Sequence, residues 1–462
     1  MAVVSSAAAA VSTPTEVPGR PPLSAWALLG LQMLAVAGVL WRTGKLAPQV
    51  VRDTVGYANF PWDSLRGALT SIRTPGYPAF LKLASLFGGD HAVVPTLQML
   101  AYFGAAAVFL AALRRAAAST GIALAAASSL LYANILHGYV ETVATDTLAA
   151  ALGILACAAT ISFSVRGGVL SGLLLILSAT AAWLVRPAYL FVIVLCPVLA
   201  VLASSVVTPA TRRSRWGLLI RVGLMVVLPL LAYCGLRQVV VGQFGIVSFG
   251  GYNLVGITGQ FLEEGDMPRL PEDLRPIAAA ALEHRVNEAP RGPYAAEPRL
   301  HYLRMENDYD PTIWSDFVPA AEHVAGDGQP INGPLRRLGT ALLFQHPRDY
   351  AVWVVKATRQ GAKKLAWDIL DNPMALLVVG LLVGAVLCRL LFAADSWPAF
   401  EPGLRLLVGL ALLYALLNLA VVIPVCPPLG RFTDAAGVFL GAPVFAGLVS
   451  LIRTGERQAS AR

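Results

Sequence analysis

The stretch DTLAAALGILACAATISFSV, residues 146–165, carries a single charged side chain, Asp146, at its start. A helix of about 20 mostly apolar residues is long enough to cross the hydrocarbon core of a bilayer. Further stretches of this kind occupy residues 24–42, 92–113, 119–137, 168–185, 188–206, 217–237, 374–393, 403–424 and 435–452. The chain is therefore predicted to be an all-α polytopic membrane protein with about ten transmembrane helices.

Composition supports a membrane protein and excludes several other classes. Hydrophobic residues make up 56% of the chain and charged residues 13%, whereas soluble domains are about one quarter charged. The net charge of +8 comes from basic residues scattered over short connections, so no nucleic-acid partner is expected. The five cysteines show no CxxC or Cys/His spacing, and neither a disulfide framework nor a zinc site is predicted.

The short connections also predict the orientation. If the N-terminus is cytoplasmic, the inner connections and the C-terminal tail contain a series of arginines: Arg114, Arg115, Arg166, Arg212, Arg213, Arg215, Arg389, Arg405, Arg453, Arg457 and Arg462. Cytoplasmic loops of membrane proteins are enriched in Lys and Arg. Both termini are therefore expected in the cytoplasm.

The predicted spans and their orientation divide the chain into five parts. Residues 1–23 are a disordered cytoplasmic N-terminus, rich in Ala, Ser, Thr and Pro. Residues 24–237 hold seven spans and the first outer loop, 43–91, while 238–372 form a mainly helical extracytoplasmic domain. Residues 373–452 hold three more spans, and 453–462 form a cytoplasmic tail. In the domain, 272–289 and 346–370 are predicted helices, the second lying on the outer leaflet with Trp353 and Trp367 near one face.

The first outer loop contains an unusual proline corner, SIRTPGYPAFLKL, residues 71–83. Each proline favours an extended residue before it, which predicts that Thr74 and Tyr77 are not helical. Pro78 then serves as the first residue of a helix. A helix N-terminus attracts phosphate, and Arg73 lies close enough to add a bidentate contact. A plain turn with a snorkelling arginine explains the pattern equally well.

The second outer loop, residues 137–150, brings acidic side chains to the mouth of a span. Glu141 and Asp146 lie there with His137 close by, and carboxylates at membrane depth usually have a function. The alternative is that Thr145 or Asp146 caps the following helix. A cap accounts for one of these acids but not for both.

Two more outer segments each carry an arginine. Arg186 follows a span in LVRP, and Arg431 precedes the last span, with Asp434 nearby. The outer segments thus bring arginines and carboxylates to one interface, a set of charges that suits an anionic, lipid-linked substrate.

The motifs DTVGYANF and RTPGYPAFL resemble the first-loop signature of bacterial GT-C glycosyltransferases, the polytopic enzymes with a PMT-like or RgtA-like domain. The residues that match this signature are Asp53, Tyr57, Arg73, Pro75, Gly76, Tyr77 and Pro78. TDTL (145–148) resembles the second acidic motif of the family. LVRP (184–187), QHPRDY (345–350) and GRF (430–432) resemble weaker landmarks, the last with Phe432 where Tyr is more usual.

The resemblance implies that a sugar moves from a polyprenyl-phosphate donor to a lipid, glycan or protein acceptor of the cell envelope, with inversion. The reaction would occur on the outer face of the bacterial inner membrane. Asp53 is the expected base, with Asp146 or Glu141 assisting. The expected substrate-binding residues are Tyr57, Arg73, Tyr77, His137, Arg186 and Arg431. Paired acids permit a divalent cation, Mg²⁺ or Mn²⁺, without requiring one, and no other cofactor is implied.

Other classes of protein remain open at this point. A transporter or flippase of lipid-linked glycans would also use many spans and a charged cavity, but it predicts charged residues in both halves of the membrane. A scaffold protein would leave the acids of the outer loops without a role. A ligase or polymerase of lipid-linked glycans has closer chemistry, but RTPGYP is not the motif expected for it.

Overall fold

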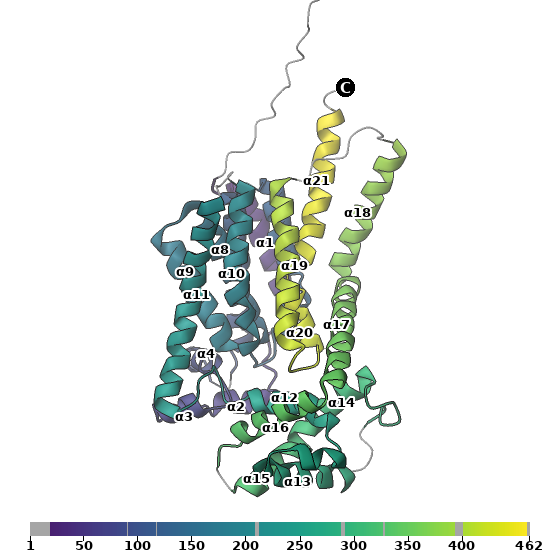
Figure 1. Ribbon diagram of the computed structural model, residues 1–462. Coiled ribbons are helices and arrows are strands. Elements are labelled where there is room, and N and C mark those ends of the chain that lie inside the picture. Colours follow the sequence, from purple (N-terminus) through teal and green to yellow (C-terminus); the bar gives the residue numbers. More distant parts are fainter. Residues whose placement is uncertain are drawn as a thin grey trace, which may run out of the picture.

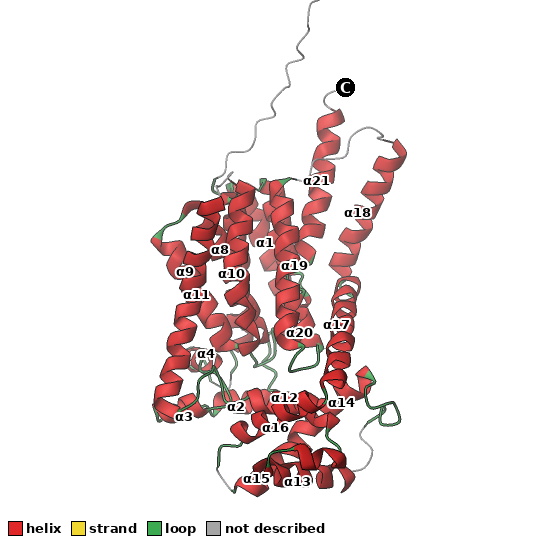
Figure 2. Cartoon of the chain, viewed as in Figure 1, coloured by secondary structure: helices red, strands yellow, loops and turns green. Residues whose placement is uncertain are grey.

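The computed structural model describes residues 19–89, 91–116, 118–207, 212–287, 292–326, 329–392 and 401–459. Throughout these ranges the regular structure consists of helices, without a strand (Figures 1 and 2). Within the same ranges a single isolated β-bridge joins Gln49 to Thr142 in parallel. Most of the segment expected to be disordered, residues 1–18, lies outside the described ranges, as do residues 460–462 of the predicted tail.

The described part of the chain contains nine segments long and apolar enough to cross a membrane, which confirms the all-α polytopic class. They are Leu23–Arg42, Val94–Arg115, Thr120–Tyr139, Asp146–Arg166, Pro187–Val206, Ser214–Val241, Pro373–Leu391, Pro402–Val422 and Gly430–Arg453. The remaining predicted span coincides with a shorter apolar helix, Val169–Val185 (α9). This helix ends because Arg186 is extended, with φ −144° and ψ 112°, before Pro187.

The long helices run side by side in Figure 1 and enclose the larger of two hydrophobic cores. With α9 they are α1 (Leu23–Arg42), α5 (Val94–Arg115), α6 (Thr120–Leu131), α8 (Asp146–Arg166), α10 (Val192–Val207, preceded by η1, Pro187–Phe191), α11 (Arg212–Val241), α18 (Pro373–Phe392), α19 (Pro402–Val422) and α21 (Gly441–Ala459). Helix α8 is buried along most of its length. Its alanines and Gly153 permit this close packing, since a Cβ on Gly153 would lie 2.6 Å from the Tyr414 hydroxyl.

A helical domain covers one end of the bundle, which we call the domain end (Figure 1). Its elements are α12 (Gly250–Thr258), η2 (Gly259–Phe261), η3 (Glu264–Arg269), η4 (Glu272–Leu274), α13 (Arg275–Asn287), α14 (Tyr302–Pro311), the π-helix η5 (Thr312–Phe317), α15 (Val318–Ala325), α16 (Asn332–Gln345) and α17 (Pro347–Leu370). The two predicted helices, 272–289 and 346–370, correspond to η4–α13 and α17. The second hydrophobic core fills this domain and continues to Leu419 of α19.

Short helices of the bundle connections lie at the same end. They are α2 (Arg52–Ala58), α3 (Leu65–Thr70), α4 (Gly76–Ala84), α7 (Asn134–Tyr139) and α20 (Gly430–Ala436). Arg237, at the end of α11, is buried and donates hydrogen bonds to the Leu69 carbonyl (2.9 Å) and to Ser248 Oγ (2.7 Å). One arginine thus joins the first loop to the start of the domain.

Helix α17 does not use both tryptophans as surface anchors, contrary to the sequence-based expectation. Trp353 is buried, and its Nε1 donates to the Ile423 carbonyl at 3.0 Å, whereas Trp367 is 51% exposed. Only Asp371 and Asn372 separate α17 from α18, and Figure 1 shows the two helices end to end beside α20 and α21. The inner face of α17 therefore packs on protein along its first half.

Candidate active site

Asp53 lies at the start of α2, held between two arginines. Its Oδ1 accepts from Arg73 Nη2 at 2.7 Å, and its Oδ2 accepts from Arg431 Nη1 at 3.0 Å. Helix α2 is fixed by Thr54, whose hydroxyl donates to the Val143 carbonyl at 2.8 Å. Residues from the first loop and from the last connection thus meet at one carboxylate.

Two tyrosines complete the first-loop part of the site. The Arg73 guanidinium lies 4.8 Å from the centre of the Tyr57 ring, and the Tyr57 and Tyr77 rings meet edge to face at 5.0 Å. Tyr77 is fully buried, and its hydroxyl donates to Gln98 Oε1 at 3.3 Å. The Gln98 amide donates in turn to the carbonyls of Val140 (3.0 Å) and Thr142 (3.1 Å). Gln98, which sequence reasoning missed, is a polar residue within an apolar span.

The proline corner differs from its predicted geometry. Helix α4 begins at Gly76 with Pro75 as N-cap, so Tyr77 is helical and Pro78 is the third residue of the helix; Thr74 alone lies outside it, as expected. A proline in the first turn removes an N–H that has no partner in the helix, so the helix tolerates it there. A Cβ on Gly76 would lie 2.5 Å from the Leu184 carbonyl carbon. Gly76 therefore permits the close approach of α4 to the end of α9.

Asp146 and Arg186 form a buried ion pair. The N-cap of α8, Thr145, makes no side-chain capping bond, so the capping alternative does not describe this helix start. The Arg186 guanidinium lies 4.7 Å from the centre of the Phe432 ring, and that of Arg431 lies 5.4 Å from the same ring. Phe432 thereby connects this pair to Asp53. We call Asp53, Arg73, Asp146, Arg186 and Arg431 the arginine centre.

Two predicted site residues contact other partners. Glu141 forms an ion pair with Lys45. His137 Nε2 lies 2.9 Å from the Leu131 carbonyl oxygen, within its own connection. Neither residue has a recorded contact with the arginine centre, so their predicted roles gain no support from the geometry.

The electrostatics of the arginine centre favour an anion. Burial alone would raise the pKa of Asp53, but the charges and hydrogen bonds of Arg73 and Arg431 outweigh burial and hold this pKa below its ordinary value. Guanidinium groups engage both oxygens of Asp53, and the described residues contain no group of three or more His, Cys, Asp or Glu able to hold a metal ion. The centre therefore does not fit a divalent cation.

The helical domain holds the segment that leads to Arg431. Side chains of α14 and α17 donate to four carbonyls of this segment: Trp353 to Ile423 (3.0 Å), Tyr350 to Pro424 (2.9 Å), Tyr309 to Val425 (3.0 Å) and Lys364 to Pro428 (3.0 Å). Pro427 and Pro428 lack backbone N–H groups, so a regular helix would leave the carbonyls of Ile423 and Pro424 without a donor. The domain thus fixes the position of Arg431.

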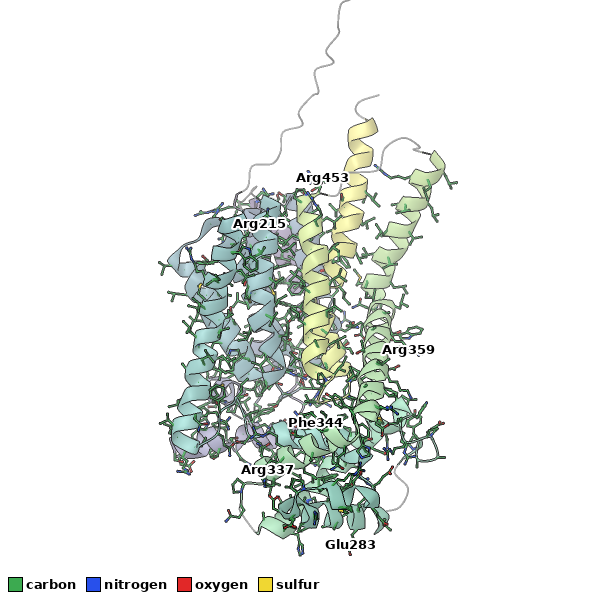
Figure 3. All side chains as sticks on the ribbon, viewed as in Figure 1. Arg215, Glu283, Arg337, Phe344, Arg359 and Arg453 are labelled. Atoms are coloured by element: carbon green, nitrogen blue, oxygen red, sulfur yellow. The ribbon has the colours of Figure 1, made fainter. Side chains whose placement is uncertain are left out.

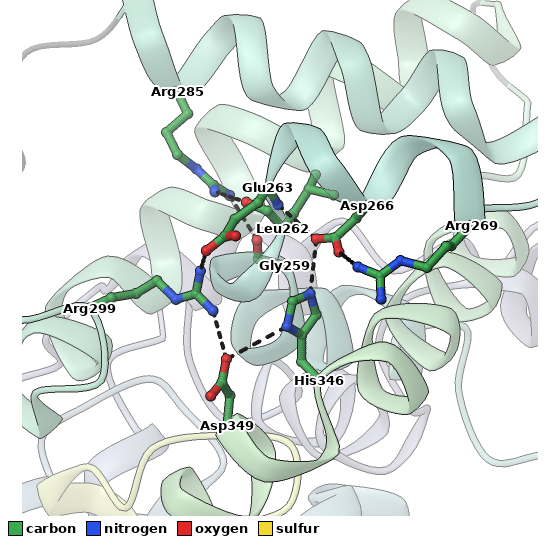
Figure 4. A network of polar contacts seen from close by, with 9 residues as sticks. All are labelled: Gly259, Leu262, Glu263, Asp266, Arg269, Arg285, Arg299, His346 and Asp349. Carbon is green, nitrogen blue, oxygen red and sulfur yellow. Dashed lines mark hydrogen bonds and ion pairs between the residues drawn. The ribbon is translucent and has the colours of Figure 1, made fainter.

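The QHPRDY motif is part of a different polar network, at the start of α17 (Figure 4). His346 Nε2 lies 2.9 Å from Asp266 Oδ2, and Arg299 Nη2 donates to Asp349 Oδ2 at 2.7 Å. Burial alone would raise the pKa of Asp266, but the Glu263 N–H, His346 and Arg269 together hold it below its ordinary value. This network ties η3 to α17 and has no recorded contact with the arginine centre.

Comparison of the chain with family models, curated proteins and solved structures gives no match.

Proposed function

We propose that this protein is a membrane glycosyltransferase that uses a polyprenyl-phosphate-linked sugar as donor. The observation that carries the proposal is that Arg73 and Arg431 each bond one oxygen of Asp53, while Arg186 contacts the same Phe432 ring as Arg431. Three guanidinium groups at the end of a helical bundle suit a lipid-linked phosphate. Arginine binds phosphate through two parallel hydrogen bonds, which fix orientation as well as charge.

The chemistry requires little beyond charge and positioning. A phosphate monoester leaves readily because its second pKa is about 6. Its negative charge grows in the transition state, and fixed cations stabilise this charge best where water is excluded. Asp53 keeps Arg73 and Arg431 side by side against their mutual repulsion. The centre is thereby preorganised before a donor binds.

The proposed orientation places the arginine centre outside the cytoplasm. Arg215 and Arg453 lie at the end of the bundle opposite Glu283 and Arg337 of the helical domain (Figure 3). Cytoplasmic ends of membrane proteins are enriched in Lys and Arg. We therefore place the domain end, the bound sugar and the acceptor on the outer face of the bacterial inner membrane.

Access from one side favours an enzyme over a transporter. The five residues of the arginine centre gather at the domain end, whereas a transporter would need charged groups along both halves of its path. The acceptor of the proposed glycosyltransferase is a hydroxyl group of a lipid, glycan or protein of the cell envelope.

The test uses the purified protein in nanodiscs with a set of radiolabelled polyprenyl-phosphate sugars and an envelope extract as acceptor. We expect transfer of one sugar, with release of polyprenyl phosphate, and loss of this activity in Arg73→Ala. Arg359→Ala, at an exposed position of α17, is the matched control and should retain it. Movement of intact donor between leaflets of proteoliposomes, with no release of polyprenyl phosphate, would show a transporter instead.

A further inference from the structure

Two carboxyl groups meet beside the arginine centre, one from α17 and one from α20. The side chains of Asp368 and Asp434 line the same pocket, close enough for each carboxyl to act on the other. Asp368 Oδ2 is buried and has no hydrogen-bond partner among the described residues. Two ionised carboxylates repel each other at such a distance, which favours a proton shared between them.

The groups around the pair are few and are mostly neutral. Thr433 lies beside Asp368 and donates its hydroxyl to the Gly430 carbonyl at 3.0 Å, and the Asn134 amide donates to the backbone carbonyl of Asp368 at 2.8 Å. Tyr139 lies beside Asp434, and Asp371 adds a further negative charge near Asp368. Burial, followed by the Asp434 carboxyl, raises the pKa of Asp368 to about 7. Among the described residues no ion pair joins either carboxyl to a cation, in contrast to Asp53.

A pocket gives the pair room on one side. It lies between the α6–α7, α17–α18 and α20–α21 connections, and its lining includes both carboxyl groups as well as Tyr132, Asn134, Asn372 and Phe445. Asn372 is fixed because its Nδ2 donates to Asn134 Oδ1 at 2.8 Å and its Oδ1 caps α18. The pocket therefore borders both acidic residues, whereas no residue of the arginine centre lines it.

Tyr139 links the pair to the arginine centre. Its hydroxyl lies beside the Asp434 carboxyl and within range of the charges of both Arg186 and Arg431. The same hydroxyl lies 3.6 Å from the Cβ position of Gly430, the residue before Arg431. Arg431 and Asp434 are three positions apart on α20, so one short helix presents a cation to Asp53 and a carboxyl to Tyr139.

The expected base, Asp53, is poorly suited to take a proton. Both of its oxygens accept hydrogen bonds from arginines, which hold its pKa below the ordinary value. A general base is most effective when its pKa lies near the working pH. The transfer reaction therefore needs another acceptor for the proton of the attacking hydroxyl.

We propose that the Asp368–Asp434 pair receives the proton of the acceptor hydroxyl through Tyr139; this inference rests on the glycosyltransferase function proposed above. The acceptor oxygen forms a bond to the anomeric carbon of the sugar. The bond between this carbon and the phosphate oxygen breaks, and its electron pair goes to the phosphate at the arginines. The acceptor proton passes to the Tyr139 oxygen as Tyr139 gives its own proton to the carboxyl pair. Asp53 is then a positioning residue for Arg73 and Arg431.

The first test needs no enzymatic activity. A carboxyl whose pKa rises on folding binds a proton that the unfolded chain has lost, so it costs stability progressively as the pH rises from about 4 to about 7. Asp368→Asn mimics the protonated form, so its melting temperature relative to the native protein should rise over this interval and stay constant above it. Glu283→Gln, at an exposed position of α13, should show no such trend. A pH-independent difference for Asp368→Asn would overturn the shared proton.

The second test is the pH dependence of transfer. We expect Asp434→Asn and Tyr139→Phe to lose the acidic limb of the kcat/KM profile and to fall at least tenfold at its maximum. Asp53→Asn should lower kcat/KM while keeping the shape of the profile. If Asp53→Asn abolishes the limb instead and Asp434→Asn keeps it, the proton goes to Asp53. Absence of transfer in the native protein, with the melting trend intact, would reject the glycosyltransferase function and leave the shared proton standing.

Discussion

Asp53 and Arg431 are 378 positions apart in the chain, yet Arg431 Nη1 lies 3.0 Å from Asp53 Oδ2. The carboxylate belongs to the first connection of the bundle, and the arginine belongs to the last. Their contact brings the two ends of the fold together and leaves Arg73 on the other oxygen of the same carboxylate.

Asp53→Asn should lower the free energy of unfolding at pH 7 by about 1–3 kcal/mol, because it removes a charged hydrogen-bond acceptor from two arginines. Since the pKa of Asp53 is depressed on folding, its stabilisation is present above the unfolded pKa of about 3.9 and is lost as the pH falls through the folded value. The melting temperatures of the native protein and the variant should therefore differ steadily from pH 8 to pH 5 and converge below about pH 4. Divergence in acid would contradict the ion pairs.

Arg73→Lys should weaken donor binding nearly as much as Arg73→Ala, by about tenfold or more. Lysine keeps the charge but loses the planar fork that spans Asp53 and the Tyr57 ring. Equilibrium binding of a polyprenyl-phosphate sugar measures the effect, with Arg359→Lys as the control. Full affinity in Arg73→Lys would mean that charge alone is required.

Gly76→Ala should destabilise the protein, because its Cβ would lie 2.5 Å from the Leu184 carbonyl carbon and α4 would have to move away from α9. Overpacking of this kind costs about 1–3 kcal/mol. Gly104→Ala is the matched control, since its Cβ would have no neighbour within 4 Å. Thermal unfolding of both variants is the measurement, and equal melting temperatures would show that α4 can shift freely.

Trp353→Phe should lower kcat/KM for sugar transfer by more than its loss of folding stability can explain. The change removes the hydrogen bond to the Ile423 carbonyl, so the segment that carries Arg431 loses one of its contacts to the domain. A buried acceptor left without its partner costs about 1–3 kcal/mol. Trp367→Phe, at a half-exposed position of the same helix, should leave activity unchanged. Equal loss of kcat/KM in both variants would exclude a positioning role for Trp353.

The helices could be predicted from sequence because each span is recognisable from the length and apolar composition of its own residues. The segment from Asp146 to Arg166 is long enough and apolar enough to cross a membrane, and both properties can be read directly from the sequence. The shorter α9 was also predicted, although it falls below the length of the other spans. Trp353 was misjudged because its burial depends on α19 and α20, which lie far along the chain.

The sequence predicts which connections lie at the same end of the bundle, because this follows from the order of the spans. It does not predict which side chains pair within that end. The membrane brings the connections at one end together, so Asp53, Arg73 and Arg431 could be expected at one interface. Whether a carboxylate in that interface faces an arginine or a lysine depends on distances that no motif encodes. Glu141 meets Lys45 for this reason, and Asp434 meets Asp368 rather than a cation.

The charges around the Phe432 ring are unevenly shared. Asp146 and Arg186 form a neutral pair, whereas the single charge of Asp53 faces two guanidinium groups. The surplus positive charge of the five residues therefore resides with Arg73 and Arg431, while Arg186 and Arg431 contact the same Phe432 ring. An arriving anion is therefore drawn first toward Arg73 and Arg431.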